Sequence, residues 1–191
     1  NAYRPLLPDI LHMDYNSFAS LDFITTHTAC VIAETVQAEA GIKPPSTEWI
    51  KALREKCSST GTLLILDEIQ AGFGRTGKLW GFEHFDIVPD MVMLGKALGG
   101  GMPLGALVAD KQLMDAFTDK PVLGHITTFG GHPVSCAAGL AAMNALLEEG
   151  WMEQVKAKEA LFHSLLVHPS IKAVHSFGLW MAVEFDSFDT C

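Results

Sequence analysis

Short apolar runs alternate with helix-length stretches along this chain of 191 residues, and this alternation is the feature that most constrains its fold. The runs at 29–33, 63–66 and 91–94 carry apolar residues at successive positions, which is typical of strands covered on both faces of a parallel sheet. A further run at 105–109 predicts another strand. The pattern favours an α/β fold with a mostly parallel sheet and flanking helices.

Helix signals occupy the stretches between these runs. Ser46 can accept a hydrogen bond from the first turn of a helix that follows two prolines. Four apolar side chains of that helix fall on one face: Trp49, Ile50, Leu53 and Cys57. Asp110 can begin a second helix that reaches Phe117, and an alanine-rich stretch predicts a long helix over 133–149 that ends at Gly150.

The character of the chain changes near residue 150. A helix is predicted over 152–167, and four of its apolar side chains should point inward: Val155, Leu161, Phe162 and Leu165. Strands predicted at 171–174 and 179–185 would form a different, mixed layer. We therefore expect residues 1–150 to be the C-terminal part of a large domain and residues 151–191 to begin a small α+β domain.

Composition excludes several classes of protein. Hydrophobic residues make up 49% of the chain and charged residues 18%, which is not the composition of a disordered chain. The formal net charge of −9 argues against nucleic-acid binding, which needs a basic face. The apolar stretches at 91–109 and 121–147 are interrupted or too short to cross a membrane. The four cysteines show no CxxC pair, so we expect reduced, buried thiols in a cytoplasmic protein.

Polar residues follow the three apolar runs: Glu34, Asp67 and, two residues further on, Lys96. In open α/β sheets, ligands bind beyond the carboxyl ends of the strands. Lys96 lies between a predicted strand and three successive glycines in an uncharged stretch, so we expect a desolvated amine that can act as a nucleophile. Asp67, at the end of a buried strand, needs a partner or a cation.

Two chemistries are open for Asp67. An acidic strand over Leu63–Glu68 would help to hold magnesium in a nucleotide hydrolase, but neither Gly-Lys pair, at 77–78 or 95–96, lies in a phosphate-binding loop. Alternatively, Asp67 and Lys96 would lie on opposite sides of a pyridine ring. The carboxylate would keep the ring nitrogen protonated while the lysine forms an imine, as in pyridoxal phosphate enzymes.

Three segments resemble the class III aminotransferases: LDEIQAGFGRTG at 66–77, PDMVMLGKALGGG at 89–101 and TTFGGHP at 127–133. Their order and spacing also agree with that family. A fourth segment, ETVQAEAG at 34–41, is similar to the family segment that usually reads E-P-x-Q-x-E-x-G, with Thr35 in place of the proline.

The resemblance implies a pyridoxal-phosphate transferase of fold type I and assigns roles to five residues. Lys96 would carry pyridoxal 5'-phosphate as a Schiff base and shuttle a proton, Asp67 would pair with the pyridinium nitrogen, and Gln70 would lie near the phenolic oxygen of the ring. Thr128 would bind the cofactor phosphate of a neighbouring subunit, which implies a homodimer or a higher oligomer. Glu39 would pair with an arginine and so switch the site between an ω-amine and a 2-oxo acid.

The implied activity is transfer of an amino group from an ω-amino or diamino acid, of the ornithine, acetylornithine or 4-aminobutyrate type, to a 2-oxo acid in amino-acid metabolism. The nucleotide hydrolase and a cofactor-free scaffold of the same fold are the alternatives. We expect no metal site and no nucleic-acid or membrane partner. Because the family's phosphate cup, ring-stacking aromatic and carboxylate-binding arginine have no counterpart here, we expect a fragment that is inactive by itself.

Overall fold

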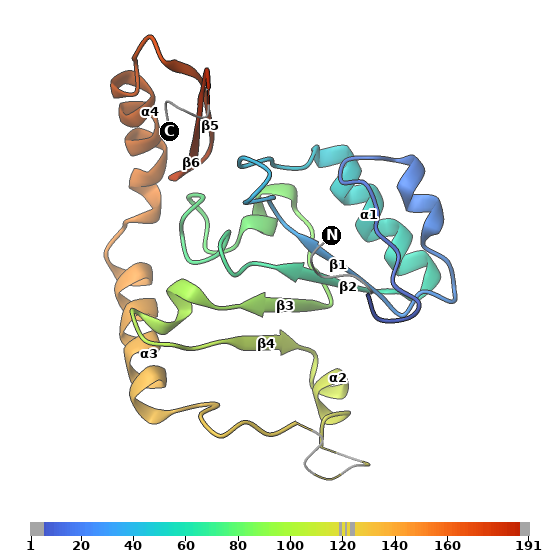
Figure 1. Cartoon of the computed structure of the whole chain (residues 1–191). Helices are drawn as coiled ribbons and strands as arrows, with labels where there is room; N and C mark the ends of the chain where they lie inside the picture. The colour runs from blue at the N-terminus through green and yellow to red at the C-terminus, as the bar shows by residue number, and fades with distance from the viewer. Residues whose placement is uncertain (1–5, 119, 121, 123–124, 188–191) are drawn as a thin grey trace.

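A four-stranded sheet lies at the centre of the computed structural model, which describes residues 6–118, 120, 122 and 125–187 (Figure 1). Its strands are, in spatial order, β1 (Cys30–Glu34), β2 (Leu63–Asp67), β3 (Met91–Leu94) and β4 (Ala106–Ala109). The first three strands are parallel, and β4 runs antiparallel to β3. The predicted α/β fold with a mostly parallel sheet is therefore confirmed, and Glu34 is paired with Asp67 at the carboxyl edge.

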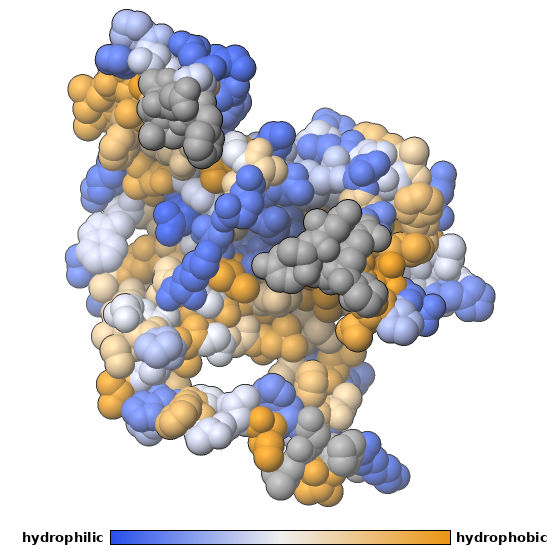
Figure 2. All heavy atoms as spheres, in the orientation of Figure 1, coloured by the Kyte–Doolittle hydropathy of each residue, from blue (hydrophilic) through white to orange (hydrophobic). Residues whose placement is uncertain are grey.

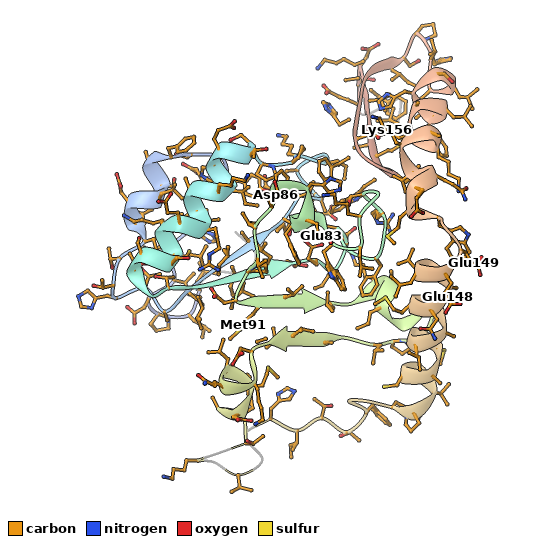
Figure 3. All side chains as sticks on the ribbon, turned by 180° about the vertical axis from the view of Figure 1, so that it is seen from behind. Glu83, Asp86, Met91, Glu148, Glu149 and Lys156 are labelled. Carbon is orange, nitrogen blue, oxygen red and sulfur yellow. The ribbon has the colours of Figure 1, made fainter. Side chains whose placement is uncertain are left out.

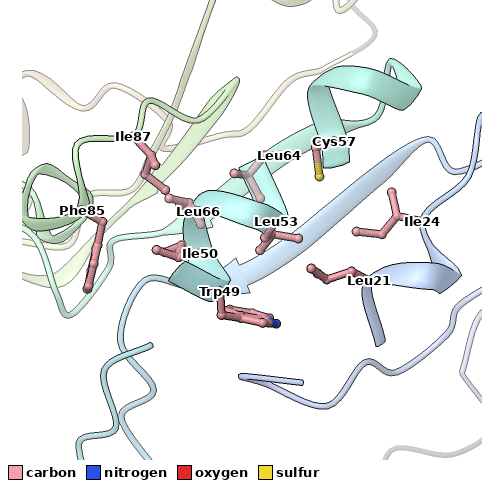
Figure 4. Packing of buried hydrophobic residues seen from close by; sticks show 10 residues of the cluster. All are labelled: Leu21, Ile24, Trp49, Ile50, Leu53, Cys57, Leu64, Leu66, Phe85 and Ile87. Atoms are coloured by element: carbon pink, nitrogen blue, oxygen red, sulfur yellow. The ribbon is translucent and has the colours of Figure 1, made fainter. Parts of the chain in front are cut away.

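Helix α1 (Thr47–Thr60) covers one face of this sheet. The Ser46 hydroxyl accepts a hydrogen bond from Trp49 N over 3.2 Å, so the predicted cap is confirmed. The apolar face of α1 packs onto Leu64 and Leu66 of β2 (Figure 4). Every side chain of this contact is at most 2% exposed: Trp49, Ile50, Leu53, Cys57, Leu64 and Leu66. The main core thus lies between α1 and β2.

The opposite face of the sheet is open at β1. The prediction that this strand is covered on both faces is wrong, because Ile32 is 62% exposed and no described element packs over it. Ile32 pairs with Ile65, and Glu34 pairs with Asp67 two positions along, so these four side chains share the open face. Figure 2 shows hydrophobic side chains over the strands in the middle of the view. The two strand-end carboxylates therefore lie on the open face.

The shorter elements are η1 (Ala19–Phe23), which precedes β1, η2 (Gly81–Phe85), η3 (Lys96–Gly99), α2 (Lys111–Asp115) and η4 (Met152–Gln154), which lies between the two helices that follow. The Asp110 side chain caps α2 as predicted, but the helix ends before Phe117. Two longer helices, α3 (Pro133–Glu148) and α4 (Val155–Leu165), precede an antiparallel hairpin of β5 (Ile171–Phe177) and β6 (Trp180–Phe185). In Figure 3, the labels Glu148 and Lys156 mark the end of α3 and the start of α4.

Both long helices leave large apolar side chains exposed. Of the four α4 side chains predicted to point inward, only Val155 is buried, and three are 47–69% exposed: Leu161, Phe162 and Leu165. That prediction is wrong for these three because no described element covers the outer side of α4. On α3, three side chains are more than half exposed: Val134, Leu140 and Leu147. None of the described helices is both long enough and apolar enough to span a bilayer.

The cysteines only partly match the expectation of buried thiols. Cys57 is buried on the inner face of α1, and burial raises the pKa of its thiol to about 11. Cys30 and Cys136 are exposed, so the prediction is wrong for these two. Cys30 begins β1 on the open side of the sheet, where no helix covers it. Cys191 lies outside the described residues.

Candidate functional site

A cavity of about 230 Å³ opens at the carboxyl edge of the sheet. Its lining residues are Glu34, Val36, Asp67, Ile69, Gln70, Lys96 and Trp180. All but the last lie at the ends of β1 and β2 or shortly after β1, β2 and β3, because parallel strands finish at the same edge of a sheet. Three residues predicted from the sequence, Asp67, Gln70 and Lys96, therefore surround one cavity.

Asp67 is the last residue of β2 and is half-buried in the cavity wall. Its Oδ1 accepts a hydrogen bond from Ile69 N over 2.9 Å. Within the described part of the chain, Oδ2 has no hydrogen-bond partner and no cationic side chain pairs with the carboxylate. A half-buried carboxylate with one oxygen available is well suited to a cationic N–H group of a ligand.

Lys96 stands two residues after β3, at the start of η3. Its φ of 46° lies in the left-handed region, which costs an L-residue about 1–2 kcal/mol. Helix α3 packs directly against this turn, since a Cβ on Gly139 would overlap the carbonyl oxygen of Leu98. The turn is thus held in a strained conformation of the kind found at functional sites.

The Lys96 side chain is exposed, so the prediction that it is desolvated is wrong for this structure. The lysine lies at the carboxyl edge beside the open face of the sheet, where no described element covers it. Its amine is therefore accessible from the cavity and from solvent. Among the described residues it forms no ion pair.

Gln70 is half-buried in the turn that follows β2. Its backbone carbonyl accepts a hydrogen bond from Arg75 Nε over 3.0 Å, which closes the turn behind the cavity. The Glu34 side chain is held directly, because its Oε2 accepts a hydrogen bond from Ala38 N over 2.8 Å. A local hydrogen bond thus fixes the backbone of Gln70 and the side chain of Glu34 at the cavity wall.

Two predicted site residues lie outside this cavity. Glu39 is exposed at the tip of a loop closed by paired backbone hydrogen bonds between Gln37 and Lys43, of 3.0 and 2.9 Å. Thr128 is exposed in the segment before α3. The structure therefore brings neither residue to the cavity of its own chain.

Trp180 is a cavity residue that the sequence did not reveal. It begins β6, is 8% exposed, and packs against Val36, Ile42 and Ala71. Leu179 N donates a hydrogen bond to Arg75 O over 2.9 Å, which joins the hairpin to the turn after β2. The contact links segments far apart in the sequence, so the only local signal is an aromatic residue shortly after a glycine turn.

Glu68 follows Asp67 and is wholly buried on the side away from the cavity. Its Oε1 accepts hydrogen bonds from Thr35 Oγ1 over 2.6 Å and from Phe82 N over 3.0 Å. Its Oε2 accepts one from Gly81 N over 2.8 Å. Burial raises the pKa of this carboxyl, and the three hydrogen bonds act in the opposite direction. Sequence reasoning placed Glu68 only in an acidic strand and missed this role.

The cavity combines an accessible amine, a carboxylate with one available oxygen, an amide and apolar walls. An amine of this kind can attack a carbonyl carbon, and a carboxylate can stabilise a protonated ring nitrogen. No group of three or more His, Cys, Asp and Glu side chains in the described ranges is placed to hold a metal ion. The amine and the carboxylate in the cavity wall are therefore suited to a ligand that contains a carbonyl group.

Comparison with known sequences places the chain near a single family. The family model Aminotransferase class-III matches residues 10–190. The chain is 41% identical over 185 residues to an acetylornithine aminotransferase of Methanopyrus kandleri, an overlap of 95% of this chain and 47% of the relative. It is 40% identical over 189 residues to ornithine aminotransferase 2 of Staphylococcus aureus, an overlap of 96% and 47% respectively.

Solved structures agree with the sequence comparison. The ornithine aminotransferase of Toxoplasma gondii matches with a TM-score of 0.87 at 33% identity, over 97% of this chain and 45% of that chain. That structure has PLP at partial occupancy at its active site. The chain thus spans about half the length of the relatives that it matches.

Proposed function

This chain belongs to the class III aminotransferase family, and we propose that the whole protein transfers an amino group from an ω-amino or diamino acid to a 2-oxo acid with pyridoxal 5'-phosphate as cofactor. One observation carries the proposal: a single cavity is lined by Lys96, Asp67 and Gln70. The names of the relatives support the substrate class. Ornithine and acetylornithine both carry a reactive amine at the end of the side chain, far from the α-carboxylate.

The described residues fit the ring and the aldehyde of this cofactor. The bound cofactor supplies an electron-withdrawing ring. Asp67 Oδ2, which has no partner among the described residues, is available to hold a proton on the ring nitrogen, while Oδ1 is kept in place by Ile69 N. Lys96 would hold the cofactor through Nζ, and the same amine would move a proton at the substrate carbon. Gln70 would lie near the ring oxygen.

Thr128 is proposed to bind the cofactor phosphate in a neighbouring subunit, so the working unit is at least a homodimer. Two observations support this proposal: Thr128 is exposed away from its own cavity, and the helix that follows it exposes several large apolar side chains. Exposed apolar surface of this kind is often buried by self-association. Glu39 is proposed to act as the carboxylate that screens an arginine from ω-amine substrates.

The nucleotide hydrolase alternative loses its basis, because the aminotransferase class-III family model matches residues 10–190, which include the acidic strand at Leu63–Glu68. An absorbance spectrum distinguishes the proposed transaminase from the cofactor-free scaffold. The full-length protein, purified with pyridoxal 5'-phosphate, should absorb near the edge of the visible range, and borohydride should bleach that band. A scaffold would show no such band.

Mass spectrometry after reduction should locate the adduct on Lys96. The Lys96→Ala variant should lose both the bleachable band and turnover, although the cofactor can still bind without a covalent bond. Lys78→Ala is the matched control, since Lys78 is an exposed lysine outside the cavity whose Nζ donates a hydrogen bond to Glu83 O. An adduct on any other lysine would overturn the assignment.

A further inference from the structure

Beneath the cavity, the Thr35 hydroxyl donates a hydrogen bond of 2.6 Å to the Glu68 carboxylate. Both side chains are wholly buried, and each residue directly follows a strand, β1 or β2. We propose that Thr35 and Glu68 are positioning residues whose hydrogen bond fixes the two strand ends that present Glu34 and Asp67 to the cavity. Their action on the cofactor rests on the proposed function.

The geometry follows from the alternation of side chains along an extended chain. Glu34 and Val36 line the cavity on one side, and Asp67 and Ile69 line it on another. The residue between each pair must point to the opposite face. Glu34 is in register with Asp67, and Thr35 N donates to Asp67 O over 3.4 Å, so the pairing continues past the strand ends. The Thr35–Glu68 hydrogen bond is therefore directly behind the cavity wall.

Glu68 also ties a third segment to this point. Its carboxylate accepts hydrogen bonds from the backbone N–H groups of Gly81 and Phe82 at the start of η2. A Cβ on Gly81 would lie 3.2 Å from Glu68 Oε1 and 3.1 Å from Ala71 Cβ, so the backbone approaches the carboxylate closely. Three donors converge on two acceptor oxygens. An amide in place of the carboxylate would turn an N–H group toward a donor, so the site selects a carboxylate.

The buried carboxylate has no cationic partner among the described residues, and only hydrogen-bond donors balance its charge. Burying a charge in this way opposes folding. Such a group next to a ligand-facing carboxylate is typical of a functional site rather than of a core selected for stability alone. The position of Glu68 is therefore explained by a role at the cavity and not by a contribution to stability.

Tyr15 holds the same strand end from another direction. Its hydroxyl donates to the carbonyl oxygens of Thr35 and Glu34, at 2.9 and 3.2 Å. The hydroxyl, the carbonyl oxygen and the N–H group of Thr35 are thus all hydrogen-bonded, to Glu68, Tyr15 and Asp67 respectively, which fixes this strand end.

The test compares four variants of the full-length protein. Thr35→Val removes the hydroxyl at constant shape, Thr35→Ser retains it, and Glu68→Gln replaces the carboxylate. Thr62→Val is the matched control, because Thr62 is 2% exposed at the amino end of β2, away from the cavity, and hydrogen-bonds Thr60 and Thr25 O. Both valine variants lose one buried hydroxyl, and the melting temperature should fall further in Thr35→Val, because the Thr35 hydroxyl bonds to a carboxylate.

Only the positioning variants should alter the cofactor site. We expect Thr35→Val and Glu68→Gln to shift the midpoint of the pH titration of the visible band and to weaken cofactor binding about tenfold, the lower limit seen when outer partners of metal ligands are removed. In the pH titration and in cofactor affinity, Thr35→Ser and Thr62→Val should match the wild type. In the protein without cofactor, the Gly81 and Phe82 amides should exchange with deuterium faster in Glu68→Gln.

The outcomes separate this inference from the proposed function. A wild-type protein without a visible band overturns the proposed function. A wild-type band with an unchanged titration and unchanged cofactor affinity in Thr35→Val overturns the positioning role alone. If Glu68→Gln does not fold, Thr35→Val decides the question, since it removes one of three hydrogen bonds and leaves the carboxylate with two donors.

Discussion

Gly178 is the point at which the C-terminal hairpin meets the turn after β2, and Gly178→Ala should weaken that contact. The residue has a φ of +68°, and an added Cβ would lie 2.6 Å from Thr76 Cα and 2.7 Å from Arg75 O. Non-bonded carbon atoms pack at about 3.5–4.0 Å, so the overlap is about 1 Å. The atoms in the way belong to the backbone and cannot rotate aside.

The expected loss of stability follows from two terms. The left-handed conformation costs alanine about 1–2 kcal/mol. Inserting a methyl group into a packed contact costs about 1–3 kcal/mol. We therefore expect a free energy of unfolding lower by about 2–5 kcal/mol. The substitution should also displace the hairpin, which is joined to Arg75 O through Leu179 N and carries Trp180 into the cavity wall. A displaced Trp180 should raise KM for the amino donor.

Urea denaturation of the full-length protein without cofactor, followed by circular dichroism, measures this loss. Gly61→Ala is the matched control, because Gly61 has a φ of +73° but no atom within 4 Å of an added Cβ. The control should lose only the conformational term of about 1–2 kcal/mol. Equal losses in the two variants would show that the hairpin contact is not close-packed and would refute the reasoning.

Three further predictions concern other residues. Glu39→Ala should raise the half-reaction rate with glutamate relative to that with ornithine, since the arginine would stay exposed; an unchanged ratio contradicts the switch. Thr128→Ala should weaken cofactor binding by about 1.5–3 kcal/mol, the value of a hydrogen bond to a charged group, as measured by titration of the cofactor-free protein. Burial, aided by the charge of Lys78, lowers the pKa of His84, so the unfolded state binds more protons and the free energy of unfolding falls as the pH drops below about 6.5. In urea titrations at several pH values, His84→Gln should make this fall less steep, and an unaltered slope would exclude the effect.

Much of the fold was predictable because its signals are local. The apolar runs that became β1, β2 and β3 are recognisable over five residues or fewer, and Ser46 begins α1 through a contact only three residues away. Asp67 and Lys96 were predictable as site residues for a related reason. Parallel strands end at one edge, so residues that follow them come together without knowledge of the packing. The division of the chain near residue 150 stays a prediction.

Burial and long-range contact were decided by the tertiary structure alone. Ile32 and Leu161 are as apolar as the core side chains, yet both are more than half exposed, because exposure depends on which element packs over each face. Trp180 reaches the cavity from the C-terminal hairpin, and Glu68 accepts hydrogen bonds from two other segments, at Thr35 and at Gly81–Phe82. Such contacts join residues whose spacing in the sequence follows no regular period, so a sequence pattern cannot reveal them. The sequence by itself determined the strands and the edge at which the ligand-facing residues meet. Only the tertiary structure decided which contacts hold those residues in place.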